Sequence, residues 1–145
     1  MADLKTNVKI VWYPDAKGYG KIESNYLKTN IAIPKALGGS GEGSDPKELL
    51  VSSAASCYIM TLVYSLQTQK LDVAGIFMDS EATNSKEDGF IIVHSLQVVL
   101  PAGATEKHIK AMNGAMTAAD QACEVGNLLK KAGVQIKIEG KIATI

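Results

Sequence analysis

The chain has 145 residues, enough for one domain, and 46% of them are hydrophobic, enough to form a core. Its 15 basic and 15 acidic residues cancel, so there is no electrostatic reason to expect nucleic acid or an anionic membrane as a partner. All the basic residues are lysines, which excludes any site built on a guanidinium fork.

The first third of the chain predicts a small sheet followed by a loop. β-Branched and aromatic residues over 7–15 predict one strand, and residues 19–34 predict one or two more, joined as a hairpin. Gly and Ser dominate residues 35–46, which we expect to be a loop. No signal-peptide layout precedes these elements, and no uninterrupted apolar run of membrane-spanning length follows them. We therefore expect a cytoplasmic protein, in which a structural disulfide is rare.

A helix is predicted to begin after the loop and to reach about Leu66. Asp45 suits the N-cap, Pro46 the first helical position, and Glu48 the third position of a capping box. Apolar residues cover most of the circumference beyond this point, so we expect a central, buried helix.

Two long strands are predicted next, over 71–85 and 89–102, around a turn. One face of the second strand is expected to point into the core and carries Phe90, Ile92, His94, Leu96, Val98 and Leu100.

A second helical region, 105–131, and a last strand, 134–145, complete the chain. The helical region carries an apolar stripe that ends in Cys123, and Gly126 and Asn127 predict a break or kink in it. The order of elements predicts an α+β fold with mostly antiparallel sheet, in a single domain over 1–145.

The two cysteines, Cys57 and Cys123, each lie on the predicted inner side of a helix, so their thiols could come within disulfide reach. One interpretation is that both are small buried hydrophobic residues. The other is a redox pair, in which one thiolate attacks a peroxide and the second thiol closes a disulfide. That chemistry needs a lowered thiol pKa, and hence a nearby positive charge or hydrogen-bond donors.

The remaining candidates for chemistry are weaker. We expect His94 to be a satisfied core histidine and His108 a solvated surface residue. Two cysteines and two histidines at these spacings match no zinc template, so neither a metal nor another bound cofactor is expected.

The segments "GSDPKELLVSSAASCYIM" and "AADQACEVGNLLKKA" resemble the OsmC/Ohr family, the osmotically inducible protein C and organic hydroperoxide resistance proteins. Residues 45–49, Asp-Pro-Lys-Glu-Leu, stand where that family has a similar stretch, and Cys57 follows at the family spacing. The loop "IPKALGGSGEG" is also similar, and the resemblance covers nearly the whole chain.

The resemblance implies an OsmC-like fold in which antiparallel sheets wrap two long central helices of an intertwined homodimer. It implies active sites at the subunit interface that reduce organic hydroperoxides. The electrons would come from external thiols or dithiols such as dihydrolipoamide. Cys57 would be the peroxidatic residue and Cys123 the resolving one.

Three departures from the family pattern concern the charge beside the thiolate. The family uses an arginine, near whose positions this chain has Lys17 and Lys35. The acid that pairs with the arginine is replaced by Lys47, with Glu48 beside it. The usual proline after the second cysteine is Glu124, whose carboxylate we expect to raise the pKa of Cys123.

The leading hypothesis is a thiol-dependent hydroperoxide reductase with Leu50, Met60 and Tyr64 lining its substrate pocket and Lys47 supplying electrostatic support. A second hypothesis is a non-catalytic protein of the same fold that binds a small apolar ligand at the dimer interface. A third is a structural or assembly subunit with inert thiols.

Overall fold

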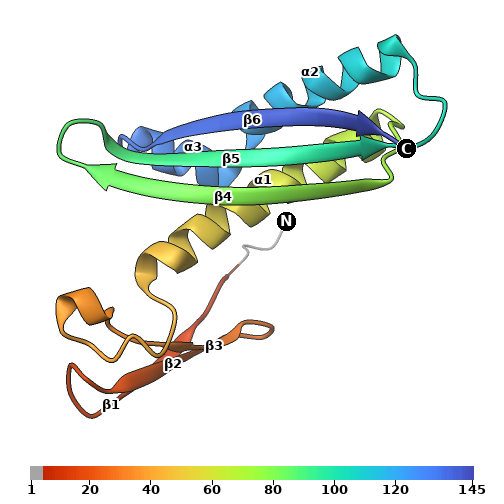
Figure 1. Ribbon diagram of the computed structural model, residues 1–145. Coiled ribbons are helices and arrows are strands. Elements are labelled where there is room, and N and C mark those ends of the chain that lie inside the picture. The colour runs from red at the N-terminus through yellow and green to blue at the C-terminus, as the bar shows by residue number, and fades with distance from the viewer. Residues whose placement is uncertain (1–4) are drawn as a thin grey trace. The chain divides into compact units, whose positions relative to one another are not determined.

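The computed structural model describes residues 5–145, and its contacts divide the chain into two compact units that meet between Leu49 and Leu50 (Figure 1). The boundary falls in the first turn of the long helix α1 (Pro46–Thr68). The sequence-based assignment of one domain over 1–145 stays a prediction.

The N-terminal unit is an antiparallel meander of strands β1 (Lys9–Tyr13), β2 (Tyr19–Glu23) and β3 (Lys28–Ile31), as the sequence predicts. The predicted loop that follows contains one short 3₁₀ helix, η1 (Lys35–Leu37).

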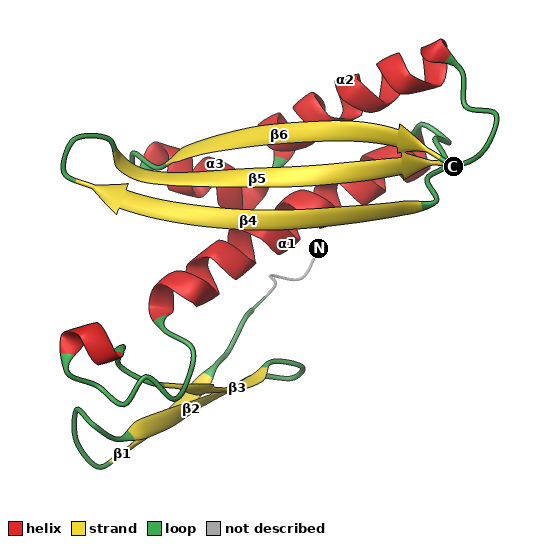
Figure 2. Cartoon of the chain, viewed as in Figure 1, coloured by secondary structure: helices red, strands yellow, loops and turns green. Residues whose placement is uncertain are grey.

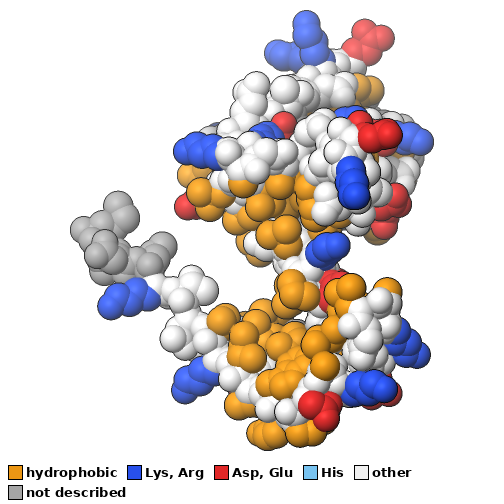
Figure 3. All heavy atoms as spheres, turned by 90° about the vertical axis from the view of Figure 1, so that its left-hand side faces the viewer, with side chains coloured by type: hydrophobic (Ala, Val, Ile, Leu, Met, Phe, Trp, Pro, Cys, Tyr) orange, Lys and Arg blue, Asp and Glu red, His pale blue; other side chains and the backbone are white. Residues whose placement is uncertain are grey.

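Much of this unit's apolar surface is exposed, and Figure 3 shows its hydrophobic side chains gathered together. They surround a pocket of about 460 Å³ lined by residues such as Ile10, Trp12, Ile22, Ile31 and Leu37.

Helix α1 begins as predicted, because the Asp45 side chain accepts a hydrogen bond of 2.8 Å from the Glu48 amide. The prediction that α1 is buried on most sides is wrong. Its buried residues form one stripe with a spacing of four: Ala54, Tyr58, Leu62 and Leu66. Met60 and Tyr64, on other faces, are 70% and 74% exposed, because the rest of the second unit covers only one side of the helix.

By length and composition α1 could cross a membrane, although no uninterrupted apolar run suggested it. The core helix of a soluble protein passes the same test, so this single helix among the described residues is weak evidence for a span.

The second unit is built on a sheet of strands β4 (Gly75–Ser85), β5 (Gly89–Leu100) and β6 (Gln135–Thr144). Strands β4 and β5 form the predicted antiparallel hairpin, and β6 lies parallel to β5 on its other side. Helices α1, α2 (Glu106–Ala122) and α3 (Glu124–Lys131) lie behind this sheet in Figure 2. From the predicted inner face of β5, Leu96, Val98 and Leu100 pack with α1 and α2 into one core, Ile92 and His94 are also buried, and Phe90 is only half-buried.

The predicted position of the helix break is wrong by three residues. The chain leaves the helical conformation at Cys123 (φ −67°, ψ 112°), between α2 and α3, while Gly126 and Asn127 are helical. The Cys123 sulfur packs closely against Gly126, where a Cβ atom would lie only 3.2 Å from it.

The two histidines differ from each other. His94 is a satisfied core residue, as predicted: its Nδ1 lies 2.7 Å from the Ser80 hydroxyl and its ring stacks on Tyr58 at 5.6 Å. His108 is not the solvated residue that the sequence predicts, because it lies one turn before the fully buried Met112. Its Nε2 is enclosed without a hydrogen-bond partner among the described residues.

Candidate thiol site

The second unit brings the two cysteines together. Cys57 lies on α1 and packs against the core cluster that includes Cys123, which is only 2% exposed. Both thiols are free, and the two side chains are in hydrogen-bonding contact. Segments 66 residues apart in the sequence therefore form one two-thiol site, with the accessible sulfur on α1 and the enclosed one at the junction of α2 and α3.

The helix break at Cys123 supplies backbone donors to this site. The first amides of a helix have no carbonyl partner within that helix. In α3 two of these, the backbone N–H groups of Glu124 and Val125, face the Cys57 sulfur. They also lie at the positive end of the α3 dipole, which favours a thiolate.

The pKa of Cys57 lies below its ordinary value as the sum of opposing influences. Burial raises it, but four hydrogen bonds outweigh burial: from the Val125 amide, the Cys123 side chain, the Thr61 hydroxyl and the Glu124 amide. The Thr61 hydroxyl lies 2.8 Å from the Cys57 carbonyl oxygen, so its proton can be directed to that oxygen or to the thiolate. Hydrogen-bond donors therefore lower the pKa of Cys57, an effect that a nearby cationic side chain could also have.

Cys123 is shifted in the opposite direction. Burial, together with Cys57 and Asp120, raises its pKa to about 11 against the lowering influence of the Gly126 amide. The expected rise in pKa is present, but its causes are burial, Cys57 and Asp120, whereas Glu124 contributes its backbone amide to Cys57. The two sulfurs are therefore unlike: Cys57 ionises at a lower pH than an ordinary thiol, whereas Cys123, with its raised pKa, keeps its proton at neutral pH and can donate it.

An open pocket of about 580 Å³ lies over Cys57. It is lined by Ser53, Ser56, Cys57, Met60, Thr61, Tyr64, Ala122 and Val125. The small side chains of α1 leave the sulfur accessible, and Met60 and Tyr64 form apolar walls. Of the three predicted substrate-contacting residues, Met60 and Tyr64 line this pocket and Leu50 does not. The lining carries no lysine, arginine or carboxylate.

The predicted supporting charges belong to the N-terminal unit, whereas the thiol site belongs to the second. Lys17 lies between β1 and β2, Lys35 begins η1, and Lys47 and Glu48 lie in the first turn of α1. Their participation stays a prediction.

A nearby positive charge or hydrogen-bond donors were both expected, but only charged side chains could be named from the sequence, so the donors that the structure places around Cys57 were missed. No sequence feature predicts the role of the Glu124 and Val125 amides, because their direction toward Cys57 depends on the exact position of the helix break. Thr61 could have been found, because a residue four positions after Cys57 on a helix shares its face.

The comparisons with known proteins agree with this fold. The family described as "OsmC-like protein" matches residues 39–139, and the chain belongs to this family. It is 30% identical over 146 residues to "Uncharacterized protein YmaD" of Bacillus subtilis (strain 168), with 98% of this chain and 97% of the relative covered.

Solved structures share the fold. An OsmC-like protein from Mycoplasma pneumoniae superposes with a TM-score of 0.74 at 17% identity, covering 98% of this chain and 99% of that one. The organic hydroperoxide resistance protein OhrB of Bacillus subtilis gives 0.59 at 20% identity, covering 93% and 98%.

Proposed function

We propose that the protein is a thiol-dependent reductase of organic hydroperoxides that acts in peroxide-stress defence in the cytoplasm. One observation carries the proposal: an accessible cysteine with a lowered pKa is in contact with a second, protonated cysteine. Membership of the OsmC-like family and the hydroperoxide-resistance proteins among the solved structures of the same fold support it.

The reaction follows from the difference between the two sulfurs. The Cys57 thiolate attacks one oxygen of the peroxide, the O–O bond breaks, and the alkoxide takes a proton and leaves as an alcohol. Cys57 is then a sulfenic acid. The Cys123 thiol attacks that sulfur, water leaves, and a disulfide remains. An external dithiol returns both sulfurs to thiols by exchange, so no bound cofactor is required.

The pocket lining indicates which hydroperoxides would fit. Met60 and Tyr64 offer apolar surface, and the lining has no cation to bind a carboxylate. A neutral, apolar hydroperoxide is therefore the better substrate.

We further propose that the protein is a homodimer. Met60, Val63 and Tyr64 leave apolar surface uncovered on α1, and such surface is typical of a protein–protein contact. Lys17, Lys35, Lys47 or Glu48 of the same or the partner chain would then complete the surroundings of the thiols.

Steady-state reduction of cumene hydroperoxide with dithiothreitol or dihydrolipoamide tests the proposal. The wild type should turn over and Cys57→Ser should not. Cys123→Ser should react once and accumulate a sulfenic acid at Cys57, which dimedone traps. Equal activity of wild type and Cys57→Ser would refute the proposal.

The alternative is a non-catalytic protein that binds a small apolar ligand. The apolar pocket of about 460 Å³ in the N-terminal unit favours it. Trp12 lines this pocket and is the chain's one tryptophan, so its fluorescence should report a bound ligand. Intact mass after one equivalent of peroxide separates the two functions: a redox pair loses about 2 Da (two hydrogens) and resists alkylation, whereas a binding protein keeps two reactive thiols.

A further inference from the structure

The break between α2 and α3 leaves carbonyl groups at the end of α2 without their helical partners, and two of these partners are the amides that face Cys57. In a continuous helix each amide donates to the carbonyl four residues earlier, so the amides of Glu124 and Val125 would bind the carbonyls of Asp120 and Gln121. Here those two amides face Cys57 instead. The Asp120 and Gln121 carbonyls must find other donors or remain unpaired.

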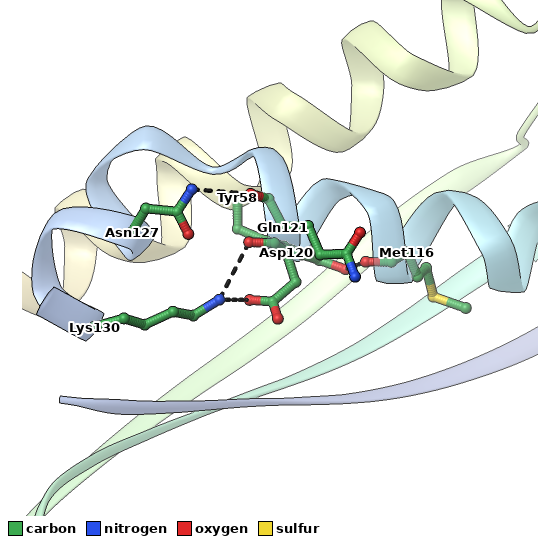
Figure 4. A network of polar contacts seen from close by, with 6 residues as sticks. All are labelled: Tyr58, Met116, Asp120, Gln121, Asn127 and Lys130. Atoms are coloured by element: carbon green, nitrogen blue, oxygen red, sulfur yellow. Dashed lines mark hydrogen bonds and ion pairs between the residues drawn. The ribbon is translucent and has the colours of Figure 1, made fainter. Parts of the chain in front are cut away.

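Two side chains of α3 take the place of the missing amides (Figure 4). The Lys130 ammonium donates to the Asp120 main-chain oxygen at 3.3 Å and to the Asp120 carboxylate at 2.9 Å. The Asn127 side-chain amide donates to the Gln121 main-chain oxygen at 2.9 Å. The Asp120 and Gln121 carbonyls thus each have a side-chain donor in place of the amide that faces Cys57.

We propose that Lys130 and Asn127 are positioning residues for the thiol site: they hold the α2–α3 break open by satisfying the carbonyls whose helical partners face Cys57. This inference builds on the proposed function, because it identifies what keeps the reactive sulfur supplied with donors. It gives the two residues a role at Cys57 although neither lines the pocket.

The proposal goes beyond ordinary surface stabilisation. The Lys130 and Asp120 side chains are 33% and 26% exposed, and an ion pair of this kind is worth little by itself. The contact to the main-chain oxygen matters more here. Without it the carbonyl would compete with the thiolate for the amides, and α2 could extend through Cys123.

The pH dependence of Cys57 alkylation in the fully reduced protein tests the proposal, with iodoacetamide as reagent and peptide mass as readout. Lys130→Met and Asn127→Leu should each slow alkylation at pH 7 by about five- to tenfold, the scale of one weakened hydrogen bond to a charged group. The pH of half-maximal rate should rise. Lys130→Arg keeps a donor and should restore most of the rate.

Lys131→Met is the matched control, because it removes a charge from the neighbouring, exposed position of α3. Asn127→Leu removes no charge, so charge loss cannot explain a slower rate in that variant. If both Lys130→Met and Asn127→Leu follow the Lys131→Met profile, the proposal is wrong. If one of them fails to fold, the other variant still decides the question.

The readout is independent of peroxidase activity. A wild type that reduces no hydroperoxide, together with shifted profiles for the two variants, would refute the proposed function and leave this inference intact. An active wild type, together with Lys130→Met and Asn127→Leu variants that keep the wild-type alkylation profile, would support the proposed function and refute this inference.

Discussion

Replacement of Glu124 by proline should weaken the Cys57 thiolate without disturbing the fold. Proline has no N–H, so Glu124→Pro deletes one of the donors to Cys57. The site tolerates it, because residue 124 is the first of α3 and Cys123 before it is extended (φ −67°, ψ 112°). No helical hydrogen bond is lost. Because proline restricts the unfolded chain, stability should be unchanged or rise by about 0.4–1 kcal/mol.

The size of the effect follows from the donors around Cys57. A hydrogen bond to a charged group contributes about 1.5–3 kcal/mol. The Glu124 amide is the weakest of the four contributors, so the lower end applies and the alkylation rate of Cys57 at pH 7 should fall by about tenfold. Glu124→Ala is the control. It removes the same carboxylate and keeps the amide, so its rate should equal or exceed that of the wild type.

Stopped-flow alkylation of the reduced protein across pH, with urea unfolding in parallel, measures both quantities. The informative comparison is between proline and alanine at position 124. If their alkylation profiles coincide while both proteins remain folded, the backbone amide of residue 124 does not stabilise the Cys57 thiolate.

Three further predictions concern the interior of the second unit. The pKa of Cys123 is raised from 9.0 to about 11 in the folded protein, so its contribution to stability is full below pH 9 and is lost as the pH rises toward 11. Over that range the free energy of urea unfolding of the reduced wild type should fall by at most about 2 kcal/mol more than that of Cys123→Ser. Asp120→Asn removes a negative charge that raises this pKa, so mass-mapped alkylation should reach Cys123 at lower pH than in the wild type; an unchanged profile would contradict the assignment. Tyr58→Phe deletes the buried hydrogen bond of 3.0 Å to the Met116 carbonyl and should cost about 0.5–1.5 kcal/mol in urea unfolding; an unchanged stability would contradict a stabilising role for this bond.

The sequence was informative wherever local chemistry decides the structure. The N-cap at Asp45 and the inner face of β5 were both predicted, because each depends on neighbouring residues or on a strand's period of two. The burial of α1 was not, because an apolar helix can be covered on one side or on all sides and only tertiary packing decides.

The break at Cys123 shows a second limit of the sequence. Gly126 has the lowest helix propensity of the residues near it, yet it is helical, because its missing side chain makes room for the Cys123 sulfur. No residue with a breaking tendency stands at position 123. The break depends instead on side-chain donors further along the chain, at Asn127 and Lys130. Helix propensities of single residues do not predict a break that depends on hydrogen bonds between residues several positions apart.

The backbone amides released by the helix break also explain how a thiolate can be stabilised in a chain without arginine. The family resemblance leads one to expect an arginine near the reactive thiol and a proline directly after the second cysteine. A proline there would have no N–H to give. Glu124 has one, and it is directed to Cys57. The absence of arginine and the backbone donor at Glu124 thus concern the same sulfur. If Glu124→Pro impairs the Cys57 thiolate as predicted, the two departures from the family pattern are a single compensated change.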